Sequence, residues 1–359
     1  MQPVNVAQQP AGSCHGNCLV AATNNSFLEN VMKNSFLSAA LFAVLSVALL
    51  PACAVAQSSV NFPTKPIRML IGFAPGGPSD ILGRVVAPKL SELLGQTVVI
   101  ENRGGAGGTI GMELTAKSAP DGYNINLGSS GNMIMAPHLY PKIGYSMQKD
   151  IAPVAQMALT AYVIAVNPSV PVKTVAQLVK LANSKKNLMS YGSSGSGATS
   201  HITAELFRMA IGAEMVHVPY KGTGPSLTAV VAGEIDMMFA DLIPALPHAQ
   251  NGRLRLLATL GSKRPAGALD LPTAAEAGVR MPPVVGRYGV VAPAGTPREV
   301  ITKLNNAIVA VLKLPDMQQR VAQIGFEVYT DTPEQFAAVL KSENEIYGPV
   351  IRKAGIKID

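Results

Sequence analysis

The stretch that sets the fold class is residues 67–80, with the sequence IRMLIGFAPGGPSD. Its apolar start, 67–73, is typical of a mostly buried strand, and the turn 74–78 leads into an amphipathic segment, 79–94. The order repeats downstream, where we expect a strand at 97–100, a helix over about 109–118 and a strand at 124–127. This alternation predicts an α/β fold with a parallel or mixed sheet.

Composition excludes several classes of protein. The chain has 359 residues, of which 48% are hydrophobic and 14% charged, and this excludes disordered, collagen-like and disulfide-scaffold proteins. The length suggests about two or three domains. The net charge is +7, but the basic residues are scattered and no aromatic residues are interleaved with them. We therefore expect no nucleic-acid partner.

Residues 1–56 differ from the remainder of the chain. Their only charged residues are Glu29 and Lys33, and an uncharged apolar run, 36–50, ends before the small-residue triplet 54–56. This pattern predicts a signal peptide cleaved after residue 56 and hence a protein exported across the membrane. The apolar run is shorter than the roughly 20 residues that span a membrane.

Two alternatives for this leader stay open. Translation can start at Met32, because residues 1–31 add nothing recognisable, and Cys53 could anchor a lipoprotein. All three cysteines (Cys14, Cys18 and Cys53) lie in the leader, so the mature chain is expected to have no disulfide and no cysteine nucleophile. The five histidines show no metal-ligand spacing, and we expect neither a metal nor a cofactor.

Four threonines are each followed three residues later by Gln or Glu, the capping-box spacing that marks a helix start. They are Thr174, Thr273, Thr296 and Thr332. Proline follows the last two, at the expected first helical position.

Two glycine-rich loops are candidates for anion binding. Residues 73–80 lie between an expected strand and helix, where glycine N–H groups and the helix N-terminus favour a carboxylate or phosphate. The alternative is a tight turn capped by Ser79 or Asp80. Residues 191–201, YGSSGSGATSH, repeat the design with added hydroxyls.

The second loop also allows an enzymatic interpretation. It is neither a Walker loop nor a G-x-S-x-G elbow, but Ser196 or Thr199 could pair with His201 in a secreted hydrolase. The segment 128–132 and the helix-opening segment 218–224 add further hydroxyls near strand ends.

Two other features have more than one interpretation. The glycine-rich segment 104–108 misses the dinucleotide fingerprint because Ile110 stands at its third glycine position, so we expect a turn with close packing. Asp241 ends an expected strand, either as a turn cap or as a ligand contact.

Short motifs in a fixed order carry a family resemblance. They are FPTKPIR at 62–68, GGxxD at 76–80, ENRxGAGG at 101–108, PDGY at 120–123, VPYKG at 218–222, LPTxxEAG at 271–278, APAGTP at 292–297 and AG at 354–355. The set resembles the substrate-binding proteins of tripartite tricarboxylate transporters, the Bug family, over residues 62–359.

The resemblance implies a type II-like periplasmic-binding-protein fold, a Venus flytrap of two α/β domains with two crossover segments. Domain one would comprise residues 60–159 and 287–359, and domain two residues 160–286. The family's ligand carboxylate lies between two loops, which correspond here to residues 73–80 and 192–201. Backbone N–H groups and hydroxyls would bind it without an Arg or Lys countercharge.

The expected ligand-binding residues come from these loops and from neighbouring strand ends. They are Phe73, Ala74, Gly76, Gly77, Asp80, Ser130, Ser193, Ser194, Gly197, Ala198, Thr199, His201 and Asp241. Among them Gly76, Gly77, Gly197 and Thr199 are expected to donate to the carboxylate. Ala198 stands where the family often has a hydroxyl.

The implied function is a monomeric, non-enzymatic receptor that closes over a small organic carboxylate by hinge motion. It would deliver the ligand to a cognate membrane permease. A receptor that docks on a signalling sensor is the alternative, and a secreted serine hydrolase is the rival from another class.

Overall fold

The structure is a computed structural model that describes residues 61–184, 188–354 and 356. Val60–Asp359 forms one compact unit. The predicted signal peptide, its alternatives at Met32 and Cys53, and all three cysteines lie outside the described residues.

The unit is built on a mixed sheet with the strand order β2-β1-β3-β9-β4-β7-β5-β6, and β8 and β10 also pair with β4. The bounds are β1 Ile67–Ile71, β2 Val98–Asn102, β3 Asn124–Ser129, β4 Ile151–Val166, β5 Met189–Ser193, β6 Met215–Pro219, β7 Met237–Asp241, β8 Arg255–Thr259, β9 Val285–Pro293 and β10 Glu327–Val328. The predicted α/β class with a mixed sheet is confirmed. We call β1–β3 and β10 the first half of the sheet, and β5–β8 the second half.

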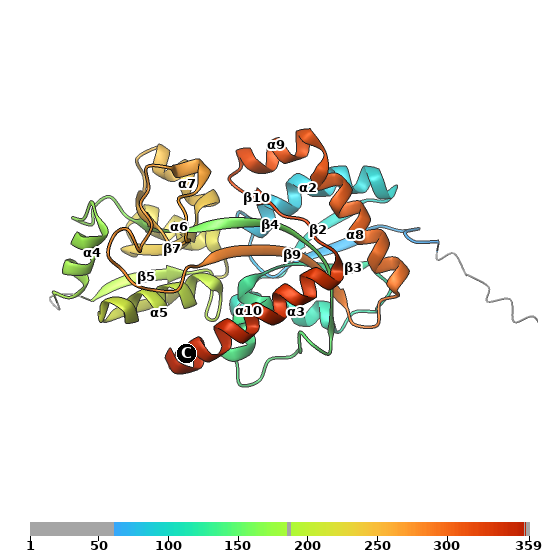
Figure 1. The fold of residues 1–359 in the computed structure, drawn as a ribbon, viewed down its shortest axis with the longest axis horizontal. Helices are drawn as coiled ribbons and strands as arrows, with labels where there is room; N and C mark the ends of the chain where they lie inside the picture. The colour runs from blue at the N-terminus through green and yellow to red at the C-terminus, as the bar shows by residue number, and fades with distance from the viewer. Residues whose placement is uncertain (1–60, 185–187, 355, 357–359) are drawn as a thin grey trace, which may run out of the picture. The chain divides into compact units, whose positions relative to one another are not determined.

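Two long strands connect the halves (Figure 1). Antiparallel β9 pairs with β4 from Ile151↔Pro293 to Ala161↔Val285, and β4 then continues alongside β7, where Tyr162 is opposite Asp241. The predicted boundaries at 159/160 and 286/287 fall inside these two strands. The domain boundaries themselves stay a prediction.

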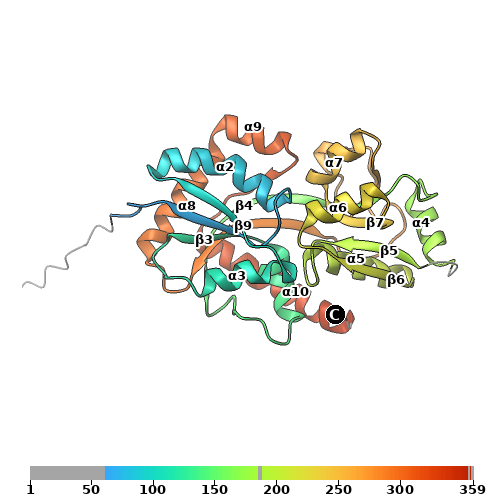
Figure 2. The same cartoon turned by 180° about the vertical axis from the view of Figure 1, so that it is seen from behind.

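Helices cover both faces of the sheet. In the first half, α2 Pro78–Leu94, α8 Arg298–Lys313 and α9 Pro315–Gln323 lie on one face, with α3 Thr109–Ala116 and α10 Pro333–Ala354 on the other (Figures 1 and 2). The second half carries α4 Val175–Ala182, α5 Thr199–Ile211, α6 Thr223–Ala232 and α7 Leu242–Gln250. The short helical turns are η1 Ala106–Gly108, η2 Gly131–Met135, η3 Ala136–His138 and η4 Ala266–Ala268. None of the described helices is long and apolar enough to cross a membrane.

Two of the four predicted helix caps are confirmed. Thr174 Oγ1 accepts the N–H of Gln177 at 3.2 Å, and Thr332 exchanges two hydrogen bonds with Gln335. After Thr273 the capping hydrogen bonds form, but only a turn follows, because Gly278 adopts φ +88° and ends it. The prediction of a cap at Thr296 is also wrong, because its hydroxyl donates to the Pro293 carbonyl and the helix begins at residue 298.

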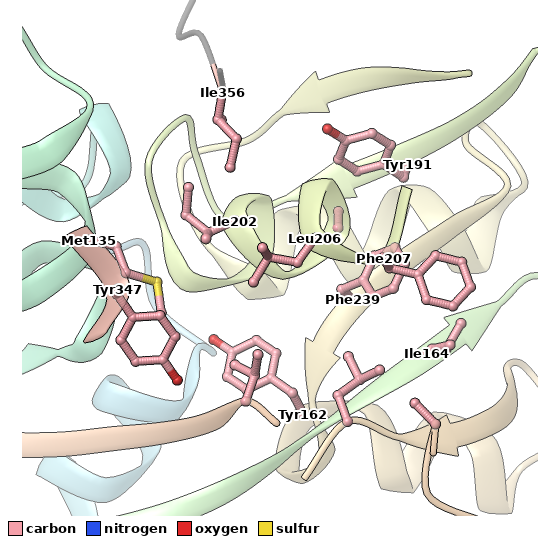
Figure 3. Close-up of a cluster of buried hydrophobic side chains, with 14 of the residues drawn as sticks. Met135, Tyr162, Ile164, Tyr191, Ile202, Leu206, Phe207, Phe239, Tyr347 and Ile356 are labelled. Carbon is pink, nitrogen blue, oxygen red and sulfur yellow. The ribbon is translucent and has the colours of Figure 1, made fainter. Parts of the chain in front are cut away.

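One buried apolar cluster reaches across both halves (Figure 3). Phe207 and Phe239 lie in the second half, with ring centroids 5.1 Å apart. Tyr347 and Ile351 bring α10, a helix of the first half, into the same cluster, and α10 packs against α5. The C-terminal helix therefore contacts both halves.

Candidate ligand-binding site

A small pocket lies where β4 and β9 pass between the halves. Its lining comes from both halves and from the two connecting strands: Phe73, Gly77, Pro78, Ser79, Ser129, Tyr162, Ser194, Thr199, Thr223, Asp241 and Tyr288. The cavity volume is ≈ 20 Å³, which is room for about one water molecule. A larger ligand can therefore enter only if the walls move apart.

The first wall is the loop between β1 and α2. Gly77, Pro78 and Ser79 line the pocket, but Gly76 and Asp80 do not. The Gly76 N–H donates to Asp80 Oδ2 at 3.0 Å, and Arg84 Nε donates to both oxygens of the same carboxylate at 3.0 Å. Asp80 therefore holds the loop through the Gly76 N–H, while Gly77, the N-cap of α2, has no side-chain cap bond.

These bonds also set the charge of Asp80. Burial would raise the pKa of this carboxyl, but the hydrogen bonds from Arg84 and Gly76 outweigh it and hold the pKa below the usual value. Asp80 is therefore ionised at neutral pH, and its charge is matched by Arg84.

The second wall is the loop between β5 and α5, where Ser194 and Thr199 face the pocket. Ser200 Oγ accepts the Ser194 N–H and contacts Ser194 Oγ, each at 2.9 Å. Ser193 lies behind, with its Oγ 2.6 Å from His217 Nε2. The loop is therefore fixed mainly by its own hydroxyls.

His201 supports this loop and does not line the pocket. Its Nδ1 accepts the N–H of Gly197 at 3.1 Å, and its ring stacks on His217 with centroids 4.0 Å apart. Burial, together with His217, lowers the pKa of His201 to about 4. The His201 ring is therefore neutral at pH 7 and can accept this hydrogen bond. The neighbouring Ala198 is buried in an apolar cluster.

The floor consists of Tyr162 on β4, Tyr288 on β9 and Asp241 at the end of β7. The Tyr288 hydroxyl donates to Asp241 Oδ1, and the Tyr162 hydroxyl bonds the same carboxyl. Asp241 is only 2% exposed. Burial raises its pKa to about 7, against the lowering effect of the two phenols.

Four helices begin at this pocket. Ser79 lies in the first turn of α2, Thr199 and Thr223 begin α5 and α6, and Asp241 is the N-cap of α7. Helix N-termini carry unpaired N–H groups and partial positive charge, and both favour an anion.

The lining is rich in hydroxyls and poor in cations. Hydroxyls come from Ser79, Ser129, Tyr162, Ser194, Thr199, Thr223 and Tyr288. Among the described residues that line the pocket, none is Lys or Arg. The described ranges also hold no group of three or more His, Cys, Asp or Glu that could bind a metal ion.

Five of the thirteen expected residues line the pocket: Phe73, Gly77, Ser194, Thr199 and Asp241. The others do not line it: Ala74, Gly76, Asp80, Ser193, Gly197, Ala198 and His201 belong to the two loops or the start of α5, and Ser130 follows β3. The N–H groups of Gly76 and Gly197, expected to face a ligand, already bond Asp80 and His201. Ser130 Oγ accepts the backbone N–H of Arg287 at 3.1 Å.

Sequence reasoning missed six lining residues: Pro78, Ser79, Ser129, Tyr162, Thr223 and Tyr288. Pro78, Ser79, Ser129 and Thr223 lie inside the candidate segments 73–80, 128–132 and 218–224. A prediction that took every residue of these segments would have included them. Tyr162 and Tyr288 lie in mainly apolar segments, although Arg287 directly precedes Tyr288. The hydroxyl of a tyrosine buried in such a segment needs a polar partner, and this requirement could have indicated that Tyr162 and Tyr288 lie near polar groups.

Loops from the two halves also contact each other through residues that do not line the pocket. The Ala74 N–H donates to the Lys221 carbonyl at 2.9 Å, and the Tyr140 hydroxyl donates to the Ser196 carbonyl at 2.8 Å. Gly107 lies so close to the second loop that a Cβ there would be 2.3 Å from the Ser196 oxygen. The close packing expected at residues 104–108 is confirmed.

Comparison with known proteins identifies the family. The profile of the tripartite tricarboxylate transporter family receptor, TctC, matches residues 82–356. The periplasmic binding protein BugD is 32% identical, with a TM-score of 0.80 over 82% of this chain and 99% of BugD.

Two further solved structures of this kind contain a ligand. Rpa4515 of R. palustris with adipate is 33% identical, with a TM-score of 0.80 over 83% of this chain and 99% of that one. MatC of Rhodopseudomonas palustris with bound malate is 30% identical, with a TM-score of 0.78 over 81% and 100%. The expected two-domain periplasmic-binding-protein fold is confirmed, and the family is one of binding receptors, not enzymes. The chain belongs to the tripartite tricarboxylate transporter receptor family, whose members include the Bug proteins.

Proposed function

We propose that this protein is a periplasmic receptor that captures a small organic carboxylate in the pocket and delivers it to a tripartite tricarboxylate-type permease. The observation that carries this proposal is the convergence of hydroxyls and four helix N-termini on a pocket whose described lining has no Lys or Arg. The adipate and malate bound by two related structures support the ligand class.

Capture would proceed by hinge motion between residues 60–159 with 287–359 and residues 160–286. The cavity of ≈ 20 Å³ is too small for either of those dicarboxylates, so the two loops must separate to admit one. Rotation about β4 and β9 separates them without breaking either half.

A thermal-shift screen tests the ligand class. Residues 57–359 would be heated with mono-, di- and tricarboxylates, amino acids, phosphate esters and nucleotides. A true ligand stabilises the fold by RT ln(1 + [L]/Kd), so the midpoint should rise with concentration. A protein stabilised only by a phosphate ester or a nucleotide would refute the proposal.

Thr199→Val tests the site. We expect a loss of affinity between about 10-fold and about 150-fold, because a hydrogen bond to a charged ligand oxygen contributes about 1.5–3 kcal/mol. The matched control is Thr203→Val, one turn along the same helix, whose hydroxyl donates to the Thr199 carbonyl. Equal losses in both variants would mean that the effect is on helix α5 and not on the ligand.

Export and delivery have their own tests. Mass spectrometry of the protein from a periplasmic extract should show a chain that begins at Gln57. Deletion of the genes for the cognate permease should abolish uptake of the ligand, and unchanged uptake would favour the sensor alternative.

A further inference from the structure

Asp241 is the feature of the pocket that an anion receptor does not explain. It is an acidic side chain that lines a site for an anion, and it is 2% exposed. A structural cap alone would not require its carboxyl to face the pocket.

The surroundings of Asp241 contain no countercharge. Tyr162 reaches it from β4 and Tyr288 from β9, and its remaining hydrogen bond comes from backbone. Thr199 on α5 brings only a hydroxyl, which bonds Tyr162. Among the described residues, no charged side chain shifts the pKa of this carboxyl.

A ligand carboxylate would bring a second negative charge into the same space. Two carboxylates that share a dry site cannot both stay ionised at moderate cost, and one of them takes up a proton. The helix N-termini and hydroxyls can bond the ligand's carboxylate as an anion, whereas Asp241 has two phenols and one backbone N–H. The proton therefore belongs on Asp241, which then becomes a hydrogen-bond donor.

Building on the proposed function, we propose that Asp241 enters the complex with a dicarboxylate as the neutral acid, so that capture takes up one proton from solution. Asp241 then favours ligands that present an oxygen acceptor at this position and disfavours ammonium groups. The free protein is poised for such a change, because burial already places the pKa of Asp241 at about 7.

The sign of the pH dependence follows from linkage. Binding raises the pKa of Asp241 further, so affinity is greatest below pH 7 and falls about tenfold per pH unit above it. With the acid kept neutral in the complex, the affinity at pH 9 is about 90-fold weaker than at pH 6.

Titration calorimetry in two buffers of different ionisation enthalpy measures the proton uptake directly, with adipate and malate as probes. At pH 8.5 the unmodified protein should take up nearly one proton per dicarboxylate, and at pH 6 about a tenth of one. Asp241→Asn should take up none, and its affinity should not change between pH 6 and 9.

The control variant is Asp331→Asn. Burial also raises the pKa of Asp331, but this residue is not among those that line the pocket, and its Oδ1 accepts the Gln156 N–H at 2.9 Å. It should keep the pH profile of the unmodified protein.

Three results would overturn the proposal while leaving a carboxylate receptor intact. They are dicarboxylate binding without proton uptake at pH 8.5, uptake that persists in Asp241→Asn, and binding of aspartate with neither adipate nor malate bound. If no carboxylate of any class binds at pH 6, the proposed function itself fails. The first and third of these results need only the unmodified protein, so they decide the proposal even if the Asn variant does not fold.

Discussion

Asp241 should also leave a signature in the stability of the ligand-free protein. Its folded pKa of about 7 lies above the ordinary 3.8, so the folded state binds this proton more tightly than the unfolded chain does. The contribution to stability is complete below pH 4 and is lost as the pH rises towards 7. About three pKa units correspond to a loss on the order of 4 kcal/mol.

Asp241→Asn removes this titration. The difference in unfolding free energy, variant minus unmodified protein, should therefore rise by on the order of 4 kcal/mol between pH 4 and pH 8. A constant cost of replacing the carboxyl cancels in this comparison. Because the chain has no tryptophan, urea unfolding would be followed by circular dichroism.

Asp80→Asn is the control with the opposite sign. The pKa of Asp80 lies below its usual value, because its hydrogen bonds from Arg84 and Gly76 outweigh burial. That carboxylate therefore adds stability above its unfolded pKa and loses it as the pH falls. A difference for Asp241→Asn that does not change with pH would refute the assignment of a buried, titrating acid.

Substitutions at two positions, Gly107 and His201, test the loops. Gly107→Ala should weaken ligand binding at least 10-fold, because its Cβ would meet the Ser196 carbonyl at 2.3 Å and keep the loops apart. The control is Gly95→Ala: Gly95 has a similar φ of +69°, but no atom lies within 4 Å of the added Cβ. This control should cost only about 1–2 kcal/mol of stability. In His201→Gln the new side chain can still accept the Gly197 N–H, whereas in His201→Leu it cannot. Calorimetry at pH 7 should show that His201→Gln retains its affinity for the ligand and that His201→Leu loses about 10-fold. Equal affinities in these two His201 variants would rule out a role for this acceptor.

Sequence patterns predicted the local elements better than their ends. The strand and helix at 67–94 appear as expected, because one apolar run and one amphipathic period specify them. The capping box at Thr273 predicted a helix that does not form, because Gly278 adopts φ +88° and the turn ends there. A cap satisfies the first N–H groups of a helix but does not make the next residues continue it.

For the site, the sequence indicated two loops that contribute to the pocket lining, but not which side of each loop faces the pocket. Gly76 and Asp80 bond each other, and His201 turns back to Gly197, so the most polar residues serve the loop itself. Tyr162 and Tyr288 join the site through pairing of distant strands, and no local pattern reports such pairing.

Because the described pocket walls have no Lys or Arg, we expect different interactions to set the association rate and the dissociation rate of a ligand. Residues 57–359 carry the whole +7, because Glu29 and Lys33 cancel. Surface charges act over a Debye length of about 10 Å at 0.1 M salt, whereas buried dipoles act at contact and are screened little. Raising the salt should therefore slow association severalfold and change dissociation by less than about twofold. Ionic strength would then govern how often a ligand is caught, and the geometry of the loops how long it stays.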